Sequence, residues 1–356
     1  MKSAANTKSK SITLSFEALD LTLAYPFGIS YGTSITSHNV LVKLEYDGHI
    51  GLGEASPASY HSETPATVLA VLGEIGSKQE KILGNDPFAA VEVARQMDLM
   101  IAGNYSAKAA IEMAMHDLAG KICHQPTYKM LGLSGHAYPM TDFTIGIDSP
   151  EMIERKTKEA VEAGYKMLKV KVGTNYDHQI IKSVRKMAPN LPLRVDANGG
   201  WSVKQAIEMS KFLAEHGVEF IEQPLPKNAL VEDFRLVRQN AAIPIFADES
   251  VCRASDVARL AGAVDGVVVK LAKCGGLLEA IRVISTARAH SMKVMFGMMI
   301  ESSIGVTAAA HLSSLCDYLD LDGALLLRDD PYQGAVYEDG YLRLPEGPGL
   351  GVAERK

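Results

Sequence analysis

Three carboxylates recur at equal intervals, each at the end of a short apolar run. Asp196 closes LPLRVD, Glu222 closes VEFIE and Asp248 closes IPIFAD. Carboxylates brought together raise each other's pKa, so three of them require a counter-charge. Oxygen ligands of this kind favour Mg²⁺ over zinc. The alternative is that each residue caps a helix, as Asp often does at a strand–helix junction, but the shared spacing of all three favours a metal site.

Lysines form the second group. Lys169 and Lys171 lie two positions apart in MLKVKV, so they point to the same side of a strand, and Lys270 follows the run VVV. Burial and the closeness of two lysines both lower a lysine pKa from about 10.4, towards the range of a general base. The alternative is surface lysines with apolar stems, which we favour only for Lys273.

Eight apolar runs, most of them followed by a stretch of helical periodicity, position these residues. This count predicts a (β/α)₈ barrel, in which the polar groups that end the strands share one face. Lys171 and Lys270 end the second and sixth strands, which lie on opposite walls of an eight-stranded ring. No full helix follows Asp322. The runs are 142–147, 167–172, 191–198, 218–224, 243–250, 265–273, 293–298 and 318–322.

The first third of the chain has a different pattern. Residues 11–55 alternate as strands do, with a hairpin signal at Asp47-Gly48, and residues 64–132 have helical periodicity. We therefore expect an α+β domain over 1–135, the barrel over 136–322, and a C-terminal segment, 323–356, that returns to the first domain.

Composition excludes several classes of protein. The 356 residues carry a net charge of −6 and no basic patch, so we expect no nucleic acid as partner. No apolar run approaches the roughly 20 residues that cross a membrane, and residues 1–10 lack the apolar core of a secretory signal. The four cysteines form no CxxC pair, and no GxGxxG or phosphate-binding loop occurs. We expect a cytoplasmic protein.

Together, the carboxylates and the lysines suit proton transfer at the carbon next to a substrate carboxylate. A bound Mg²⁺ polarises the substrate carboxylate and stabilises the enediolate that forms when the α-proton leaves. A lysine on each face allows one to remove the proton and the other to return one, which inverts the carbon. Departure of a leaving group would instead give elimination or cycloisomerisation.

The motifs KVK (169–171), DAN (196–198), IEQP (221–224), ADES (247–250) and KLAKCGG (270–276) resemble those of the enolase superfamily, muconate-lactonizing-enzyme subgroup. The resemblance covers nearly the whole chain. It implies a modified (β/α)₈ barrel with an N-terminal α+β capping domain that the C-terminal segment completes. It also implies one Mg²⁺ per subunit. The implied roles are metal binding by Asp196, Glu222 and Asp248, acid–base catalysis by Lys171 and Lys270, electrostatic support and substrate contact by Lys169, and supporting positions for Asn198 and Glu249.

The end of the barrel narrows the reaction. Asp320 and Asp322, in DLDG, resemble the DxD motif of dipeptide epimerases. In that motif the two aspartates hold the α-ammonium of the substrate, and two carboxylates satisfy the N–H donors of an ammonium well. The alternative is an ordinary acidic strand end. No histidine ends the seventh strand, so acid-sugar dehydration loses support. Thr144 and Met298 are expected to line the pocket, unless they are barrel packing.

The resemblance also bears on the substrate. In the epimerases acting on Ala-Glu, an Arg of the first loop pairs with the glutamate; here PFGISYGTSITSHN contains no basic residue, and Gly32 takes that position. Glu54 and Glu63 would suit a cationic side chain, unless Glu54 is a strand-end group, as in many members of the family. We therefore expect an isomerase, a dipeptide epimerase acting on the C-terminal residue of small cationic or neutral dipeptides. The alternatives are an N-succinylamino acid racemase, an o-succinylbenzoate synthase, another cycloisomerase, or a metal-binding barrel without catalysis. Homo-oligomer formation stays open.

Overall fold

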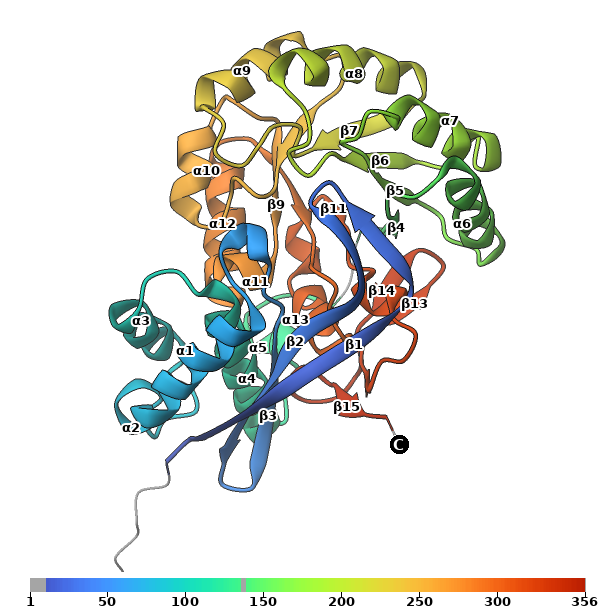
Figure 1. Cartoon of the computed structure of the whole chain (residues 1–356). Helices are drawn as coiled ribbons and strands as arrows, with labels where there is room; N and C mark the ends of the chain where they lie inside the picture. Colours follow the sequence, from blue (N-terminus) through green and yellow to red (C-terminus); the bar gives the residue numbers. More distant parts are fainter. Residues whose placement is uncertain (1–10, 136–138, 356) are drawn as a thin grey trace, which may run out of the picture.

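A computed structural model describes residues 11–135 and 139–355 (Figure 1). The segment 1–10, in which we expect no secretory signal, lies outside the described residues. The domain boundary expected after residue 135 falls at 136–138, which also lies outside them. Among the described residues, no helix has both the length and the apolar character needed to cross a membrane.

The eight predicted parallel strands form one sheet whose order follows the sequence. Its strands are buried on both faces, which explains their continuous apolar runs. A parallel bridge joins Thr141, two residues before the first strand, to Leu319 of the last strand, so the sheet closes into a barrel. The strands are β4 (Phe143–Ile145), β5 (Leu168–Lys171), β6 (Leu193–Asp196), β7 (Val218–Glu222), β8 (Ile245–Ala247), β9 (Gly266–Val269), β10 (Lys293–Phe296) and β11 (Tyr318–Leu319).

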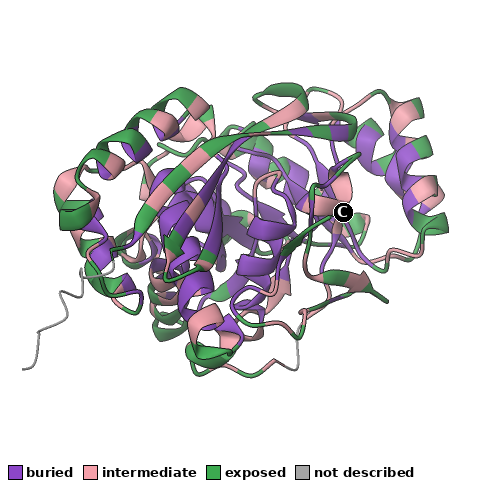
Figure 2. Cartoon of the chain, turned by 90° about the horizontal axis from the view of Figure 1, so that it is seen from below, coloured by how far each residue is buried: buried purple, intermediate pink, exposed green. Residues whose placement is uncertain are grey.

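Helices surround the barrel, and most of them have exposed outer faces and buried inner faces (Figure 2), whereas all residues of α11 and α13 are buried. Their N-termini often use local capping; Ser202, for example, accepts from Gln205 N and the Gln205 side chain accepts from Ser202 N. After β11 only a 3₁₀ turn follows, Gly323–Leu326, as the sequence predicts. The helices are α6 (Pro150–Glu162), α7 (Asp177–Met187), α8 (Val203–Glu215), α9 (Val231–Asn240), α10 (Ala254–Leu260), α11 (Leu271–Cys274), α12 (Leu277–Ala289) and α13 (Ser303–Ala310).

The N-terminal part is a three-stranded antiparallel sheet, β1 (Thr13–Ile29), β2 (Gly32–Tyr46) and β3 (His49–Ala55), with helices packed against it. The predicted hairpin at Asp47-Gly48 is confirmed, and both residues have positive φ. Gly53 allows close packing of β3 on α4, because a Cβ there would lie 1.8 Å from Ala110 O. The helices are α1 (Pro65–Ser77), α2 (Gln79–Ile82), α3 (Ala90–Met100), α4 (Tyr105–Cys123) and α5 (Thr127–Met130).

Hydrogen bonds dock the β1–β2 hairpin, blue in Figure 1, onto the barrel. Ser30 Oγ donates to Asn198 O (2.8 Å), and Ser37 Oγ and Asn39 Nδ2 donate to Ile300 O (3.0 and 2.9 Å). The C-terminal segment also contacts the N-terminal part, where Leu350 N donates to Asp117 Oδ1 (2.7 Å). Its strands are β12 (Tyr332–Gln333), β13 (Val336–Glu338), β14 (Tyr341–Arg343) and β15 (Ala353–Glu354).

Candidate active site

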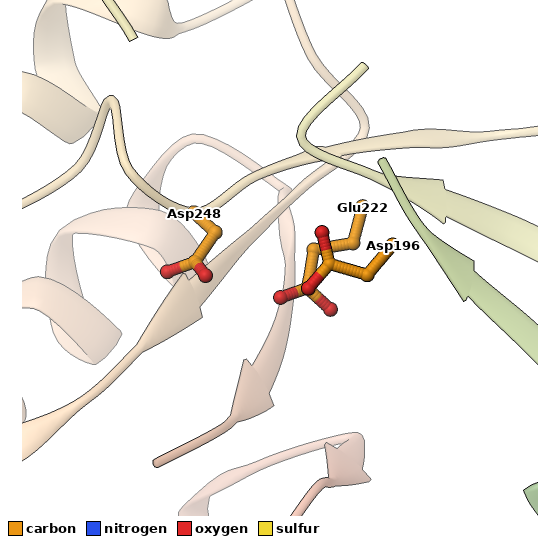
Figure 3. Close-up of side chains that lie close together, drawn as sticks. All are labelled: Asp196, Glu222 and Asp248. Carbon is orange, nitrogen blue, oxygen red and sulfur yellow. The ribbon is translucent and has the colours of Figure 1, made fainter. Parts of the chain in front are cut away.

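The three regularly spaced carboxylates meet at the carboxyl ends of neighbouring strands (Figure 3). Asp196 and Glu222 are paired in register as the last residues of β6 and β7, and Asp248 directly follows β8. All three are buried, and one oxygen from each lies within 4.8 Å of the others. None of them caps a helix, since α8, α9 and α10 begin seven or more residues after β6, β7 and β8. The helix-cap alternative is therefore wrong.

The carboxylate cluster has the properties of a cation site. Burial, and then the charge of Asp196, raise the pKa of Glu222 well above its usual value. Neither carboxylate oxygen of Glu222 accepts a hydrogen bond from the described residues, although Oε2 lies 2.6 Å from Lys169 Nζ. A divalent cation would relieve this repulsion and use the free lone pairs, and an all-oxygen donor set suits Mg²⁺.

Lys171 and Lys270 line one cavity from opposite walls of the barrel. Lys171 ends β5 and Lys270 follows β9, and β6, β7 and β8 lie between these two strands. Each ammonium contacts a carboxylate of the cluster: Lys171 Nζ lies 2.5 Å from Asp196 Oδ2, and Lys270 Nζ lies 2.7 Å from Asp248 Oδ2. The two lysines thus face the same space from opposite sides.

Lys169 is completely buried and does not line that cavity. Its Nζ lies 2.6 Å from both Glu222 Oε2 and Asp320 Oδ2. Burial alone would lower the pKa of Lys169, but the carboxylates, Asp320 first, raise it well above its usual value. Burial would likewise lower the pKa of Lys270, but Asp248, with Tyr60 and Glu222 after it, together raise it well above its usual value. The lowering expected for Lys169 is wrong, because the carboxylates of Glu222 and Asp320 lie against its ammonium.

Lys273 is the clearest departure from the sequence-based prediction. We expected a surface lysine, yet the side chain of Lys273 is buried, with 1% exposed. The chain enters α11 immediately after β9, so Lys273 lies on the same side as Lys270, about one helical turn later. Its Nζ donates to Asp248 Oδ1 and Asp248 O, both at 2.5 Å, and to Val268 O at 2.8 Å. Lys273 therefore holds Asp248 in position.

Asn198 and Glu249 lie beside the cluster. Asn198 N donates to Asp196 Oδ1 (2.8 Å), and Asn198 Nδ2 donates to Glu249 Oε1 (3.1 Å). Burial, and then the charge of Asp248, raise the pKa of Glu249 to about 7. These contacts fix the orientation of Asp196.

Asp320 and Asp322 line the same cavity of about 380 Å³. Thr144 joins them, since its Oγ1 donates to Asp320 Oδ1 (3.2 Å) and its N donates to Asp322 Oδ2 (2.6 Å). Burial, and then Asp320, raise the pKa of Asp322 to about 7. Met298 also lines the cavity, and its Sδ accepts from Gly323 N (3.1 Å). Of the residues predicted to contact the substrate, Asp320, Asp322, Thr144 and Met298 line the cavity, whereas Lys169 does not.

Two tyrosines that the sequence did not single out cover the cavity. Tyr31, in the β1–β2 turn, stacks on Tyr60, with ring centroids 4.8 Å apart and planes 15° apart. Both line the cavity, and Tyr60 Oη donates to Met299 Sδ (3.2 Å). They lie in loops without periodicity, and the one available signal is an aromatic residue in each of two Gly/Ser-rich segments.

Glu54 and Glu63 do not line the cavity. Glu54 is buried and accepts hydrogen bonds from Ser302 N and Gly305 N at the start of α13. Glu63 accepts from the backbone N of the first two residues of α4. Helix N-termini attract carboxylates, so both residues serve the fold. Neither residue therefore lines a pocket for a cationic side chain, and Glu54 lies at the end of β3, as the alternative interpretation has it.

A closed parallel barrel with three convergent carboxylates, covered by an N-terminal α+β unit, is the architecture of the enolase superfamily. Residues 11–132 match the model of the mandelate racemase/muconate lactonizing enzyme N-terminal domain, and residues 152–355 match that of enolase C-terminal domain-like proteins. The chain therefore belongs to the mandelate racemase/muconate lactonizing enzyme family of this superfamily.

Similar proteins include an L-Ala-D/L-Glu epimerase of Bacteroides thetaiotaomicron, 39% identical over 95% of this chain and 87% of its own length. A hydrophobic dipeptide epimerase of Roseobacter litoralis is 37% identical over 92% of this chain and 94% of its own length. Among solved structures, the dipeptide epimerase of Cytophaga hutchinsonii complexed with Mg and D-Ala-L-Val has a TM-score of 0.91 and 35% identity, covering 97% of this chain and 96% of that one.

Proposed function

We propose that this protein is a Mg²⁺-dependent dipeptide epimerase that inverts the α-carbon of the C-terminal residue. The observation that carries the proposal is the placement of Lys171 and Lys270 on opposite walls of one cavity, which Asp320 and Asp322 also line. The similar epimerases, one of them complexed with Mg and a dipeptide, support it.

Asp196, Glu222 and Asp248 would hold one Mg²⁺. When bound, the ion polarises the substrate carboxylate and stabilises negative charge on the adjacent carbon. Asp248, if it held the ion, would stabilise the protonated form of Lys270 less. Lys270 can then exist as the neutral amine that a general base requires.

The two lysines divide the proton transfer between them. A neutral lysine on one wall removes the α-proton, and the ammonium on the other wall delivers a proton to the opposite face. The configuration inverts, and the lysines exchange roles for the other epimer. Lys169 contacts no substrate in this scheme; it is a positioning residue, because its ammonium links Glu222 to Asp320.

Asp320 and Asp322 would pair with the ammonium of the N-terminal residue. Charge-assisted hydrogen bonds of this kind are stronger than neutral ones. N-succinyl compounds carry a carboxylate instead, which these two side chains would repel. The pair therefore favours a dipeptide over the substrates of the alternative racemase and synthase.

The cavity walls favour a neutral, apolar side chain on the inverted residue. The similar epimerases differ in the side chain for which they are named, so their names leave the choice open. Among the described lining residues, the cations are Lys171 and Lys270, whereas Tyr31, Tyr60 and Ile300 supply apolar surface. With Glu54 and Glu63 outside the cavity, a cationic side chain also loses its expected partners.

Proton exchange with solvent tests the proposal. A library of L-X-L-Y dipeptides in D₂O should gain one deuterium at the C-terminal α-carbon, measured by mass spectrometry, in the presence of Mg²⁺ and not after chelation. The Asp320→Asn/Asp322→Asn variant should lose this activity. Absence of exchange across the library would exclude the epimerase, and full activity of the double variant on N-succinylamino acids would establish the racemase in its place.

A further inference from the structure

A second cavity, of about 180 Å³, lies beside the candidate active site. Its walls come from residues 23–27 of β1, residues 143–146 in and after β4, the last turns of α6, and Leu325 and Leu326 of the 3₁₀ turn after β11. That turn stands where a complete barrel unit would have its last helix, which leaves room beside α6. We call this cavity the lateral slot.

The lateral slot shares part of its wall with the active-site cavity. Phe27, Thr144 and Leu326 line both. Thr144 N donates to Asp322 Oδ2, so the shared wall adjoins the carboxylates that would hold the substrate ammonium. Burial, and then the charge of Asp322, raise the pKa of Tyr165, which lines the slot, to about 12. Asp322 therefore lies close to both cavities.

The lining of the slot is apolar and its charged residues are paired. Phe143 and Tyr165 stack with centroids 4.1 Å apart, and Ala160 and Ala163 leave space on the α6 side. Lys156 Nζ donates to Asp148 Oδ2 (2.9 Å), and Glu159 Oε2 accepts from Tyr25 Oη (2.9 Å). The slot thus offers apolar surface and no unpaired charge among its described residues, which suits a neutral hydrocarbon group.

We propose that the lateral slot binds the side chain of the N-terminal residue of the dipeptide and selects bulky apolar ones. This inference rests on the proposed function, because it takes the substrate ammonium to lie at Asp320 and Asp322. The ammonium and the side chain share one carbon, so a side chain that leaves this carbon past Thr144 meets the shared wall. A cavity of about 150 Å³ accepts benzene, so 180 Å³ accommodates leucine, isoleucine or phenylalanine.

The preference that the lateral slot gives for a larger side chain can be expressed as a ratio of kcat/KM values. Each buried methylene contributes enough to change kcat/KM by about fourfold. Leucine has three more carbons than alanine, so L-Leu-L-Leu should have a kcat/KM on the order of 10- to 100-fold above that of L-Ala-L-Leu.

The experiment measures kcat/KM for a series X-L-Leu, with X as Gly, Ala, Val, Leu or Phe, on the full-length protein with Mg²⁺. Ala163 is exposed and lines the slot, so Ala163→Trp fills it without disturbing the core. This variant should reduce the Leu-to-Ala ratio to about 1. Leu325→Ala enlarges the slot and should move the optimum towards Phe. Val161→Trp is the matched control, since it places the same ring on an exposed position of α6 outside the slot and should keep the wild-type ratio.

Two results would overturn the inference. One is a wild-type enzyme that epimerises all dipeptides of the series but whose kcat/KM does not increase with the size of X. The other is a Leu-to-Ala ratio that Ala163→Trp leaves unchanged while circular dichroism shows a folded protein. Either result leaves the proposed function standing, whereas a wild-type protein that inverts no member of the series contradicts both.

Discussion

Replacement of Lys273 by methionine removes a buried charge while keeping most of the side-chain volume. The change deletes the hydrogen bonds that its Nζ donates to Asp248 and to Val268 O. Lys270 remains 2.7 Å from Asp248 Oδ2, so the carboxylate keeps one partner. Two buried backbone carbonyls and one carboxylate oxygen nevertheless lose a charged donor.

Loss of one member of a buried ion pair costs about 3–5 kcal/mol of unfolding free energy. In a chain of this size, about 2 °C in melting temperature corresponds to 1 kcal/mol, so Lys273→Met should melt about 6–10 °C below wild type without metal. The difference should shrink with saturating Mg²⁺, because the cation would then compensate the charge of Asp248.

Differential scanning fluorimetry, with EDTA or with Mg²⁺, measures both values. Lys204→Met is the matched control, because the side chain of Lys204 is 86% exposed, and its melting temperature should stay within about 1 °C of wild type. An equally small shift for Lys273→Met in EDTA would refute the conclusion that Lys273 holds Asp248.

Three further predictions follow from the site. Because Asp322 has a pKa of about 7, it takes up a proton as the pH falls through 7 and then no longer pairs with an ammonium. In a pH–rate profile, kcat/KM for a dipeptide should therefore fall below pH 7. Asp322→Asn should remove most of this fall. At Gly32 a Cβ would meet no atom within 4 Å, although φ is +145° and a side chain there is strained. Gly32→Arg should raise the ratio of kcat/KM for L-Ala-L-Glu to kcat/KM for L-Ala-L-Leu by about tenfold or more. An unchanged ratio would contradict the placement of residue 32 beside the substrate side chain. Mg²⁺ at about 100 times its Kd should add about 2.7 kcal/mol to the free energy of unfolding of wild type and almost nothing to that of Glu222→Gln, as urea titration with and without the ion would show.

The barrel and the carboxylates were predictable because strand periodicity and register act locally. Continuous apolar runs predict strands buried on both faces, and in neighbouring parallel strands the terminal residues meet at one edge. The sequence pattern alone therefore predicts that Asp196 and Glu222 are neighbours in the fold. The absence of a helix after Asp322 was equally visible, and the structure has only a 3₁₀ turn there.

Other features depend on tertiary contacts that no local pattern encodes. Lys273 points inward because α11 begins at once after β9, which the run DGVVVKLAK does not show. Glu54 contacts the start of α13, a helix about 250 residues further along the chain. A lysine pKa rises when carboxylates lie close to it and falls when burial and other lysines dominate. Only the folded structure shows that carboxylates dominate at Lys169 and Lys270.

Isotope exchange in the two single-lysine variants tests the central claim most directly. In D₂O with Mg²⁺, Lys171→Ala and Lys270→Ala should both fail to epimerise a dipeptide. Each should still exchange the α-proton of one epimer, and the two variants should act on opposite epimers, because each retains the base on one face only. Exchange of the same epimer by both variants, or epimerisation by either, would contradict proton transfer by two opposed lysines.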